Sequence, residues 1–388
     1  MKKILFLVYD MNVGGVEKSL LNLLSALSSN QYEIHVGMVH KRGGFMESLP
    51  SGVIIHEIKC YSQNWRLIND PPRKVIRQLL LSVHIKDALL NLFFWIDFKL
   101  THNRIRFFNY LLKNEPVFPE SFDLAVSFAG PSQMLDYYVC KKVEAKKKCA
   151  WIHFDISKVA IDKGMIARLY KQLDKIFIVS WEGKKIFDYY FPQFSGKTEV
   201  FYNIVTQDQV LKFANIGPSY DDTFDGKRIL TVGRISEEKG QRLAVLALKI
   251  LIGNGINVKW VFVGDGKERG YCEKLAHDLG IEGFVSFLGT QINPYGYMKD
   301  CDVYVQPSRH EGFCITLLEA SCFRMPIVAT DFTGAVEQLK DRPNGIITSM
   351  QVDAIVRGIL KAFEIGPLQH SIPLPIKNDL SKLKVLLQ

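Results

Sequence analysis

Short apolar runs rich in β-branched residues alternate with helical patterns along nearly the whole chain. Near-continuous apolar runs are typical of strands buried on both faces, and strands that alternate with helices form parallel sheets. The first set of runs is Ile4–Tyr9, Ile34–Val39, Val53–Ile58, Leu124–Phe128, Lys148–His153, Ile176–Val179 and Glu199–Tyr202. The second set is Arg228–Val232, Val258–Val263, Val285–Phe287, Val303–Gln306, Ile327–Ala329 and Gly345–Ile347. We therefore predict an α/β chain with two doubly wound, Rossmann-like parallel sheets.

A polar segment that separates the two sets predicts the domain boundary. It contains Gly217-Pro218 and the aspartates Asp221, Asp222 and Asp225, and the 388 residues of the chain exceed the ~100–200 of one ordinary domain. We predict a first domain over residues 1–205, a linker over 206–226, a second domain over 227–365, and a tail, 366–388, that could return to the first domain. Ligands bind such sheets at the carboxyl ends of the strands, so the domains are expected to face each other across a cleft.

The formal net charge of +9 is confined to the first half of the chain, which predicts an acidic partner on that side. Residues 1–200 hold 28 Lys and Arg against 19 Asp and Glu, whereas residues 201–388 hold 21 of each. Residues 65–115 are rich in Leu, Phe and Trp and carry 9 basic against 4 acidic residues. Pro71-Pro72 predicts the start of one helix here, and Lys86–Leu112 predicts more.

Two compatible interpretations apply to residues 65–115. They are extra helices packed on the first domain, or a basic amphipathic surface that lies on an anionic membrane. The run Lys141–Lys148 adds four net positive charges, although such a run is usually a solvated face. No nucleic-acid recognition motif accompanies the positive charge, so we expect no nucleic-acid partner.

The amino-terminal sequence and the cysteines favour a cytoplasmic protein. The first apolar run is six residues long and ends at Asp10, which is too short for a signal peptide and predicts a strand. No stretch approaches the ~18 uninterrupted apolar residues of a membrane-spanning helix. The seven cysteines are an odd number without a Cys-x-x-Cys pair, which is typical of reduced thiols and not of a zinc site or a disulfide framework.

Two motifs of the first half lie at the predicted cleft. Gly14-Gly15 follows the first strand and precedes a helix, where backbone N–H groups can approach an anion, although a simple turn is equally compatible. His153 closes a strand of the same sheet. A lone histidine is more often a core residue, but at this position it can donate a hydrogen bond to a reacting sugar phosphate.

In the second half, Arg234 and Lys239 follow the strand Arg228–Val232. Two cations at the carboxyl end of a cleft strand can neutralise a diphosphate, with Arg as a planar fork and Lys as a point charge. The alternative is that both are ordinary residues at the start of a helix. Asp300-Cys301-Asp302 has the Asp-x-Asp pattern of a metal-binding pair, but it begins a strand, so a structural role is favoured there.

The segment Pro307–Ala320 predicts a strand end, a tight loop at Gly312 and a helix from about Ile315. Glu311 lies in the loop and Glu319 in the helix, separated by seven residues. Backbone N–H groups near Gly312 and Phe313 can meet a sugar or phosphate oxygen. Either glutamate alone would be taken for a surface residue, but together with the upstream cations they form a specific arrangement.

These residues resemble the retaining, nucleotide-sugar-dependent glycosyltransferases of family 4, which have the GT-B fold and a Glu-x(7)-Glu signature. The resemblance covers about residues 1–365 and is strongest over 228–347. It implies donor-binding roles for Gly14, Gly15, Arg234, Lys239, Thr290, Ile292, Gly312, Phe313, Thr316 and Glu319, and catalytic roles for His153, Arg234, Lys239 and Glu311. In the resemblance, the basic pair holds the donor diphosphate and Glu311 binds the hydroxyls of the donor sugar. Glu319 binds the ribose hydroxyls, and the loop Gly289–Ile292 contacts the base. Pro326, Gly334 and Glu337 also fit the family.

Two residues depart from the family pattern. Cys314 stands where a small glycine is usual, and Met325 where glycine usually precedes Pro326. Neither change removes a polar group, but both could reshape the loop. The carboxyl-terminal end is also short, because only Ile376–Gln388 could form the helix that family members return to the first domain.

The resemblance implies a hexosyl- or N-acetylhexosaminyl-transferase of the bacterial surface-polysaccharide type, for capsule or lipopolysaccharide. A UDP-sugar is favoured as donor over GDP-mannose, and the acceptor is a glycan, expected to be lipid-linked, at the inner face of the cytoplasmic membrane. Because Glu311 is assigned to hydroxyl binding, same-face attack is favoured, in which the leaving diphosphate takes the acceptor's proton. No metal or other cofactor is expected. The alternatives are a non-catalytic nucleotide-sugar-binding subunit and a GT-B nucleotide-sugar epimerase.

Overall fold

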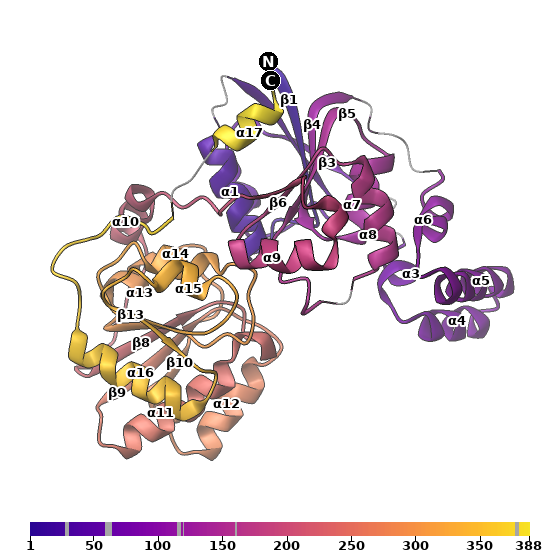
Figure 1. Cartoon of the computed structure of the whole chain (residues 1–388). Coiled ribbons are helices and arrows are strands. Elements are labelled where there is room, and N and C mark those ends of the chain that lie inside the picture. Colours follow the sequence, from indigo (N-terminus) through magenta and orange to yellow (C-terminus); the bar gives the residue numbers. More distant parts are fainter. Residues whose placement is uncertain (28–30, 59–63, 115–117, 119, 160, 377–379) are drawn as a thin grey trace.

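Two parallel sheets with helices on both faces form the two domains of the protein, as the sequence predicts (Figure 1). The structure is a computed structural model that describes residues 1–27, 31–58, 64–114, 118, 120–159, 161–376 and 380–388. The predicted fold class of two doubly wound, Rossmann-like parallel sheets is confirmed. In the described part of the chain, no helix combines the length and the apolar character needed to cross a bilayer.

The first domain contains a seven-stranded parallel sheet of order β3-β2-β1-β4-β5-β6-β7. Its strands are β1 (Lys2–Val8), β2 (Tyr32–Met38), β3 (Ile54–Glu57), β4 (Ser121–Gly130), β5 (Glu144–Ile152), β6 (Lys175–Ile178) and β7 (Thr198–Val200). Its flanking helices are α1 (Gly15–Ala26), α7 (Gln133–Lys141), α8 (Lys163–Leu169) and α9 (Trp181–Tyr190). Alternate side chains of central β1 enter different cores, with Ile4 and Phe6 on one face and Leu5 and Leu7 on the other. This two-sided burial explains the continuous apolar run.

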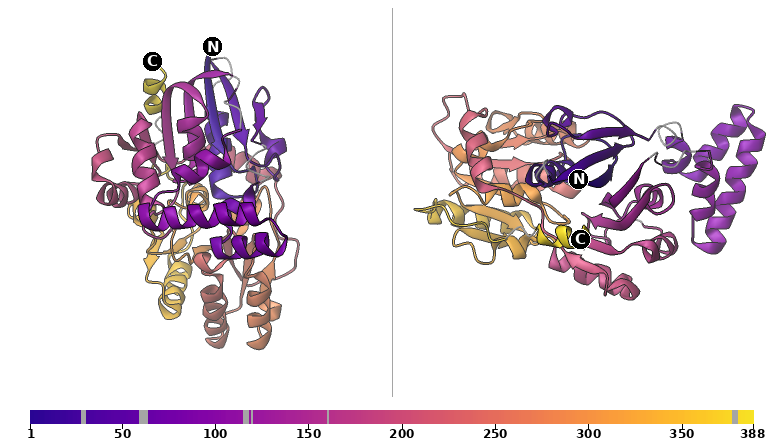
Figure 2. Two further views of the ribbon diagram at one scale, coloured as in Figure 1. Left: turned by 90° about the vertical axis from the view of Figure 1, so that its right-hand side faces the viewer. Right: turned by 90° about the horizontal axis from the view of Figure 1, so that it is seen from above.

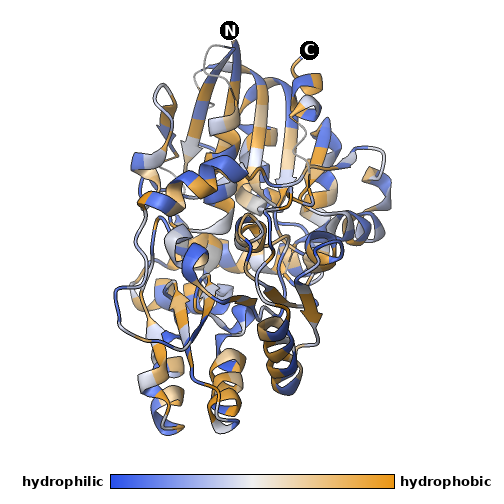
Figure 3. Ribbon diagram, turned by 90° about the vertical axis from the view of Figure 1, so that its left-hand side faces the viewer, coloured by the Kyte–Doolittle hydropathy of each residue, from blue (hydrophilic) through white to orange (hydrophobic). Residues whose placement is uncertain are grey.

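The second domain contains a six-stranded parallel sheet of order β10-β9-β8-β11-β12-β13. Its strands are β8 (Lys227–Val232), β9 (Val258–Val263), β10 (Val285–Phe287), β11 (Val303–Gln306), β12 (Ile327–Thr330) and β13 (Gly345–Thr348). Its helices are α11 (Gln241–Gly253), α12 (Arg269–Asp278), α13 (Tyr295–Asp300), α14 (Ile315–Ala320), α15 (Ala335–Leu339) and α16 (Val352–Ile365). Hydrophobic colour follows the strands, whereas the outer helices alternate between the two colours (Figure 3).

Short 3₁₀ helices lie at the ends of several of these elements. They are Met46–Ser48, Tyr170–Gln172, Pro192–Phe194, Glu237–Lys239 and Glu282–Phe284. The basic run 141–148 overlaps the start of strand β5. Two of its lysines are paired, Lys146 with Asp123 at 2.8 Å and Lys147 with Asp174 at 2.9 Å, so part of its charge is neutralised locally.

Residues 65–114 form helices α3 (Trp65–Asn69), α4 (Pro72–Leu81), α5 (Ile85–Thr101) and α6 (Ile105–Leu111). The helices predicted from Pro71-Pro72 and from Lys86–Leu112 are therefore present. In the right-hand view of Figure 2, α4 and α5 stand side by side and apart from both sheets. Residues 59–63 and 115–117, which flank this segment, lie outside the described residues, as does Cys60. The other six cysteines are buried free thiols.

The chain passes between the domains twice. The segment 206–226 that the sequence indicates as a linker includes helix α10 (Gln207–Ile216), which packs against α13 of the second domain. The tail ends in α17 (Ser381–Leu386), which lies beside α1 of the first domain (Figure 1). Leu383 is fully buried there, and Lys382 Nζ donates to the carbonyl of Val200 at 2.7 Å.

A carboxylate of each domain accepts backbone N–H groups at a helix N-terminus of the other domain. We call this set of contacts the interdomain latch. Glu337 of α15 accepts the backbone N–H of Trp181 at 3.1 Å and of Glu182 at 2.9 Å, at the start of α9. Tyr202 donates its hydroxyl to the same carboxylate at 3.0 Å. In return, Glu182 accepts the N–H of Gly334 at 3.4 Å, at the start of α15. A carboxylate is stabilised at a helix N-terminus because the N–H groups there have no partner within the helix.

Removing the Glu337 carboxylate is expected to loosen the contact between the domains. For Glu337→Ala we predict a larger radius of gyration in small-angle X-ray scattering and a ~10-fold weaker affinity for a donor nucleotide, the equivalent of ~1.4 kcal/mol. The matched control is Glu364→Ala, at an exposed position on α16. Unchanged scattering and affinity in Glu337→Ala would show that the latch does not hold the domains together.

Candidate active site

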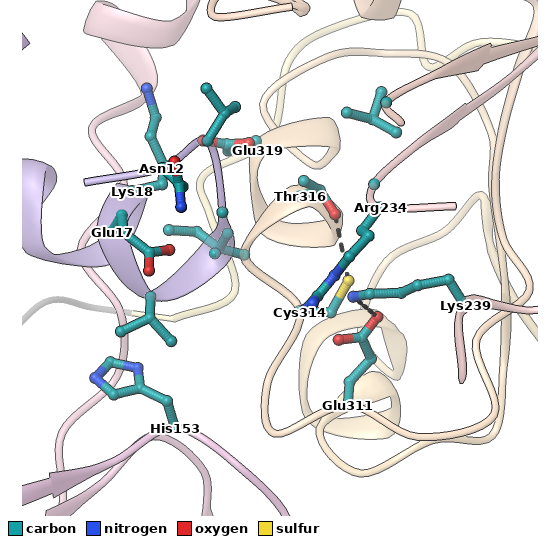
Figure 4. A pocket seen from close by; sticks show the side chains of 18 of the residues that line it. Asn12, Glu17, Lys18, His153, Arg234, Lys239, Glu311, Cys314, Thr316 and Glu319 are labelled. Carbon is teal, nitrogen blue, oxygen red and sulfur yellow. Dashed lines mark hydrogen bonds and ion pairs between the residues drawn. The ribbon is translucent and has the colours of Figure 1, made fainter. Parts of the chain in front are cut away.

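A cavity of about 720 Å³ lies between the two domains, where the carboxyl ends of several strands meet. Cavities of ~300–1,000 Å³ are typical of small-molecule and cofactor sites. All the site residues expected from the sequence line it, and their assigned roles stay predictions. They are Gly14, Gly15, His153, Arg234, Lys239, Thr290, Ile292, Glu311, Gly312, Phe313, Thr316 and Glu319. Figure 4 shows first-domain side chains on one side of the cavity and those of the second domain on the other.

Lys239 and Glu311 form an ion pair on the second-domain wall. Lys239 Nζ lies 2.5 Å from Glu311 Oε1, which also accepts the hydroxyl of Ser308 at 2.7 Å. Burial alone lowers the pKa of Lys239, but the carboxylate of Glu311 outweighs it, so that the pKa lies above its usual value. Lys239 is therefore charged at neutral pH, and Glu311 Oε2 makes no hydrogen bond within the described residues.

Arg234 is a cation of the cavity wall without an ion-pair partner. It follows β8, its side chain is exposed toward the cavity, and no ion pair or side-chain hydrogen bond joins it to any described residue. Its backbone carbonyl is fixed by Gln241 Nε2 at 2.9 Å. The basic pair expected from the sequence thus divides into one free guanidinium and one ammonium held by Glu311.

Glu319 lies deeper, near the first turn of α1. Its Oε1 accepts the hydroxyl of Tyr295 at 2.7 Å. Burial raises the pKa of Glu319, while the nearby Lys18 and Tyr295 oppose that rise. Lys18 Nζ lies 5.3 Å from the centre of the Tyr295 ring, close enough for a cation–π contact. This cluster joins helix α1 of the first domain to α13 and α14 of the second.

His153 is neutral in this structure. Burial lowers the pKa of its imidazole to about 3, and its Nε2 is buried without a hydrogen-bond partner in the described chain. A buried ring nitrogen without a partner costs free energy unless a ligand or water satisfies it. Because the ring is uncharged at neutral pH, it can act toward a ligand as a hydrogen-bonding group and not as a cation.

The loop after β11 touches the first domain at Gly312. A Cβ atom built on Gly312 would lie 1.8 Å from the carbonyl oxygen of His153, so that no other residue fits without moving a backbone. Ser180 Oγ donates to the Gly312 carbonyl at 3.2 Å, and Thr333 Oγ1 to Asp155 at 3.1 Å. Glycine is therefore required here for close approach of two domains.

The two departures from the family pattern have different structural consequences. Cys314 precedes α14 with φ of 66°, in the left-handed region that favours glycine. This explains why glycine is usual at that position, and the buried thiol lies 3.4 Å from Thr316 Oγ1. Met325 has no positive φ, and its side chain is buried in the core, where only packing distinguishes it from glycine.

Further polar residues of the first domain line the cavity without having been expected from the sequence, among them Asn12, Glu17 and Lys18. They follow β1 on either side of Gly14-Gly15, and Figure 4 shows all three on the first-domain wall. Burial raises the pKa of Glu17 to about 7, with Asp10 adding to the rise and Arg234 opposing it. Their position next to Gly14-Gly15 could have indicated them, because the first turn of helix α1 faces the cleft.

One group of described residues has the composition of a metal site, namely His35, His56 and Glu120. None of them lines the cavity. The two imidazoles are hydrogen bonded to each other at 2.8 Å, and Lys3 Nζ lies 2.7 Å from Glu120. The lysine competes with any cation for that carboxylate, so the group is a hydrogen-bonded cluster of the first sheet.

Comparison with known proteins agrees with this geometry. Residues 222–373 match the family model described as "Glycosyl transferases group 1". An N-acetylgalactosamine-N,N'-diacetylbacillosaminyl-diphospho-undecaprenol 4-alpha-N-acetylgalactosaminyltransferase of Campylobacter jejuni is 24% identical over 352 residues, 90% of this chain and 87% of that protein. The lipopolysaccharide core biosynthesis glycosyltransferase LpsE of Rhizobium meliloti is 32% identical over 130 residues, 34% of this chain and 37% of that protein.

Several other curated relatives also align over less than half of their own length. Among solved structures, Anabaena Alr3699/HepE in complex with UDP-glucose superimposes with a TM-score of 0.63 at 17% identity, covering 94% of this chain and 90% of that chain. The chain is thus similar to group 1 glycosyltransferases over its second domain and to proteins of the GT-B fold over nearly its whole length, and the names of two partial relatives place those proteins in lipopolysaccharide core and capsular polysaccharide biosynthesis.

The Glu17 carboxyl is expected to give the site a pH dependence near neutrality. As the pH rises through about 7 the carboxyl ionises and adds a negative charge near Arg234. We predict that the affinity for a nucleotide-sugar diphosphate falls between pH 6 and 8, because the diphosphate is itself an anion, and that Glu17→Gln flattens this fall. Calorimetry at a series of pH values measures it.

The matched control for Glu17→Gln is Glu237→Gln, an exposed residue that does not line the cavity. It should keep the wild-type pH dependence. An equal fall in affinity in Glu17→Gln and in the wild type would contradict the role of this carboxyl.

Proposed function

We propose that this glycosyltransferase moves a sugar from a nucleoside diphosphate sugar to a glycan acceptor, with retention of the anomeric configuration. The observation that carries the proposal is the second-domain wall of the cavity. There an unpaired guanidinium (Arg234) and a partly buried lysine–glutamate pair (Lys239 and Glu311) lie at the carboxyl ends of neighbouring strands. This arrangement offers positive charge to a diphosphate and one free carboxylate oxygen to a sugar hydroxyl.

In this proposal, departure of the diphosphate is the step that the site accelerates. Arg234 and Lys239 stabilise the negative charge that develops on the leaving group, which is the largest kind of contribution a preorganised site makes. Glu311 Oε2 accepts a sugar hydroxyl while Oε1 stays with Lys239. The acceptor attacks the same face of the sugar, and its proton goes to the departing diphosphate. Neutral His153 contributes a hydrogen bond beside the donor sugar.

A UDP-sugar is the favoured donor and GDP-mannose the alternative. The support is indirect: the solved structures of Anabaena Alr3699/HepE hold UDP, UDP-glucose, and UDP with glucose, and share the fold at 17–18% identity. The loop that contains Thr290 and Ile292 lines the cavity, where the resemblance assigns the base. Transfer of a hexosyl or N-acetylhexosaminyl group fits the same cavity.

A lipid-linked glycan is the proposed acceptor, in synthesis of a capsule or lipopolysaccharide. The name of the Campylobacter relative includes a diphospho-undecaprenol acceptor, and that alignment covers 90% of this chain. The positive charge of the first domain supports a peripheral position on the anionic inner face of the cytoplasmic membrane. We propose no metal and no further cofactor, because two cationic side chains can take the place of a metal at the diphosphate.

An assay of donor consumption tests the two central residues. For Lys239→Ala and for Glu311→Ala we predict a loss of ~10²–10³ in rate, the size expected for a preorganised charge contact. Lys274→Ala and Glu282→Ala are exposed matched controls in the same domain and should keep full activity. A loss of only ~2-fold in either cavity variant would rule out the assignment.

The same assay separates the remaining alternatives. We expect turnover to persist in the presence of EDTA, and its loss, restored by a divalent cation, would show that a metal serves the diphosphate. Tight donor binding without turnover on any acceptor would identify a non-catalytic binding subunit. Conversion of the nucleotide sugar without an acceptor would identify an epimerase.

A further inference from the structure

An exposed apolar stripe runs along one face of helix α5. Its members are 47–78% exposed, whereas side chains of this kind are normally buried. They recur at intervals of four, four, three and four residues, which places them on one face of a helix. We call this stripe the α5 ridge; it consists of Ile85, Leu89, Phe93, Ile96 and Leu100.

The ridge continues past the start of α5 into the turn that joins it to α4. Leu81, the last residue of α4, is 74% exposed, and Val83 in the turn is 78% exposed. The two helices pack on each other through their other faces, with Arg73 5.6 Å from the centre of the Trp95 ring. A contiguous exposed apolar surface of this extent marks an interaction site with another body.

Two exposed positive charges flank the ridge, and neither aspartate of α5 is exposed beside it. At 100° per residue, Lys86 and Lys99 lie on opposite sides of the ridge. Both lysines are exposed, and neither forms an ion pair within the described ranges of the chain. Asp87 lies on the opposite face of the helix, and Asp97 is buried and bonded to Arg106 at 2.9 Å.

The position of the helix pair leaves the ridge accessible. In Figure 1, α4 and α5 lie beside the first domain at the level where the two domains meet, and in Figure 2 they project away from both sheets. Together with the 47–78% exposure of its side chains, this position leaves the ridge open to a partner.

We propose that the α5 ridge inserts into the acyl region of an anionic bilayer while Lys86 and Lys99 bind lipid headgroups. This inference rests on the proposed function, which places the enzyme at a membrane with a lipid-linked acceptor. An apolar stripe flanked by lysines is complementary to a bilayer, whose acyl layer lies beneath anionic headgroups. A second copy of the chain is a poorer occupant, because ridge-to-ridge contact would bring the flanking cations of both copies together.

The proposal differs from purely electrostatic adsorption in its dependence on salt. Contacts between exposed charges weaken as the Debye length falls from ~10 Å at 0.1 M to ~3 Å at 1 M salt, whereas burial of apolar side chains does not. Anionic lipid should therefore promote binding at low salt, and insertion of the ridge should keep the protein bound at high salt.

Flotation with phosphatidylcholine vesicles, with and without phosphatidylglycerol, tests this. The full chain should float with the anionic vesicles at both ~0.1 M and ~1 M salt. Leu89→Ser combined with Phe93→Ser should lower the partition coefficient at least ~10-fold, the equivalent of ~1.4 kcal/mol or more. Lys86→Glu combined with Lys99→Glu should remove the preference for anionic lipid.

The matched control combines Tyr189→Ser with Ile216→Ser, which are 83% and 73% exposed outside the helix pair, and it should float like the wild type. Equal thermal melting of all variants excludes misfolding as the cause of a loss. The proposal is overturned if the ridge variant floats like the wild type, or if the wild type sediments as a dimer without lipid and the ridge variant as a monomer.

Turnover on a water-soluble acceptor analogue separates this inference from the proposed function. The ridge lies outside the cavity, so the ridge variant should keep its rate on the soluble analogue and lose it on acceptor embedded in vesicles. Normal flotation with no turnover on any acceptor would instead refute the proposed function and leave the ridge inference standing.

Discussion

The structure depends on holding the carboxyl ends of two parallel sheets opposite each other. Each sheet places its reactive loops at one edge, and neither edge alone encloses a ligand. The interdomain latch provides the constraint, because the carboxylate of Glu337 occupies the N-terminus of α9, and Glu182 occupies that of α15. The close approach of Gly312 to His153 completes it. Cavity residues from both domains then lie around one space.

Within that space the two cations are not equivalent. Lys239 is held by Glu311, so its position is fixed before any ligand arrives. Arg234 has no partner in the described chain, and its charge is available to an incoming anion. A partly buried pair beside an unpaired guanidinium supplies positive charge without the reorganisation that water would require. The first-domain wall adds groups that are neutral or near their titration point, His153 and Glu17.

The sequence predicted the strands well, because two-sided burial in a parallel sheet imposes continuous apolar runs. The sequence also predicted that the selected polar residues lie at one cleft, because the strands of a parallel sheet all end at the same edge. It could not predict the ion pair of Lys239 with Glu311, which joins residues 72 positions apart, or the left-handed backbone at Cys314. The polar composition of segment 206–226 concealed helix α10, whose few buried residues give only a weak helical pattern. The sequence did not indicate Glu17 as a cavity residue, because a glutamate in the first turn of a helix is common.

The most direct test of the central claim, that Arg234 is reserved for a diphosphate, is calorimetric comparison of matched ligands. UDP and uridine, with GDP and guanosine as a second pair, differ only in the phosphates. We predict that the diphosphate of the cognate pair binds at least ~100-fold more tightly than its nucleoside, a difference in binding free energy of ~2.7 kcal/mol. Arg234→Ala should remove most of this difference. Equal affinity for nucleotide and nucleoside, or an undiminished difference in Arg234→Ala, would contradict it.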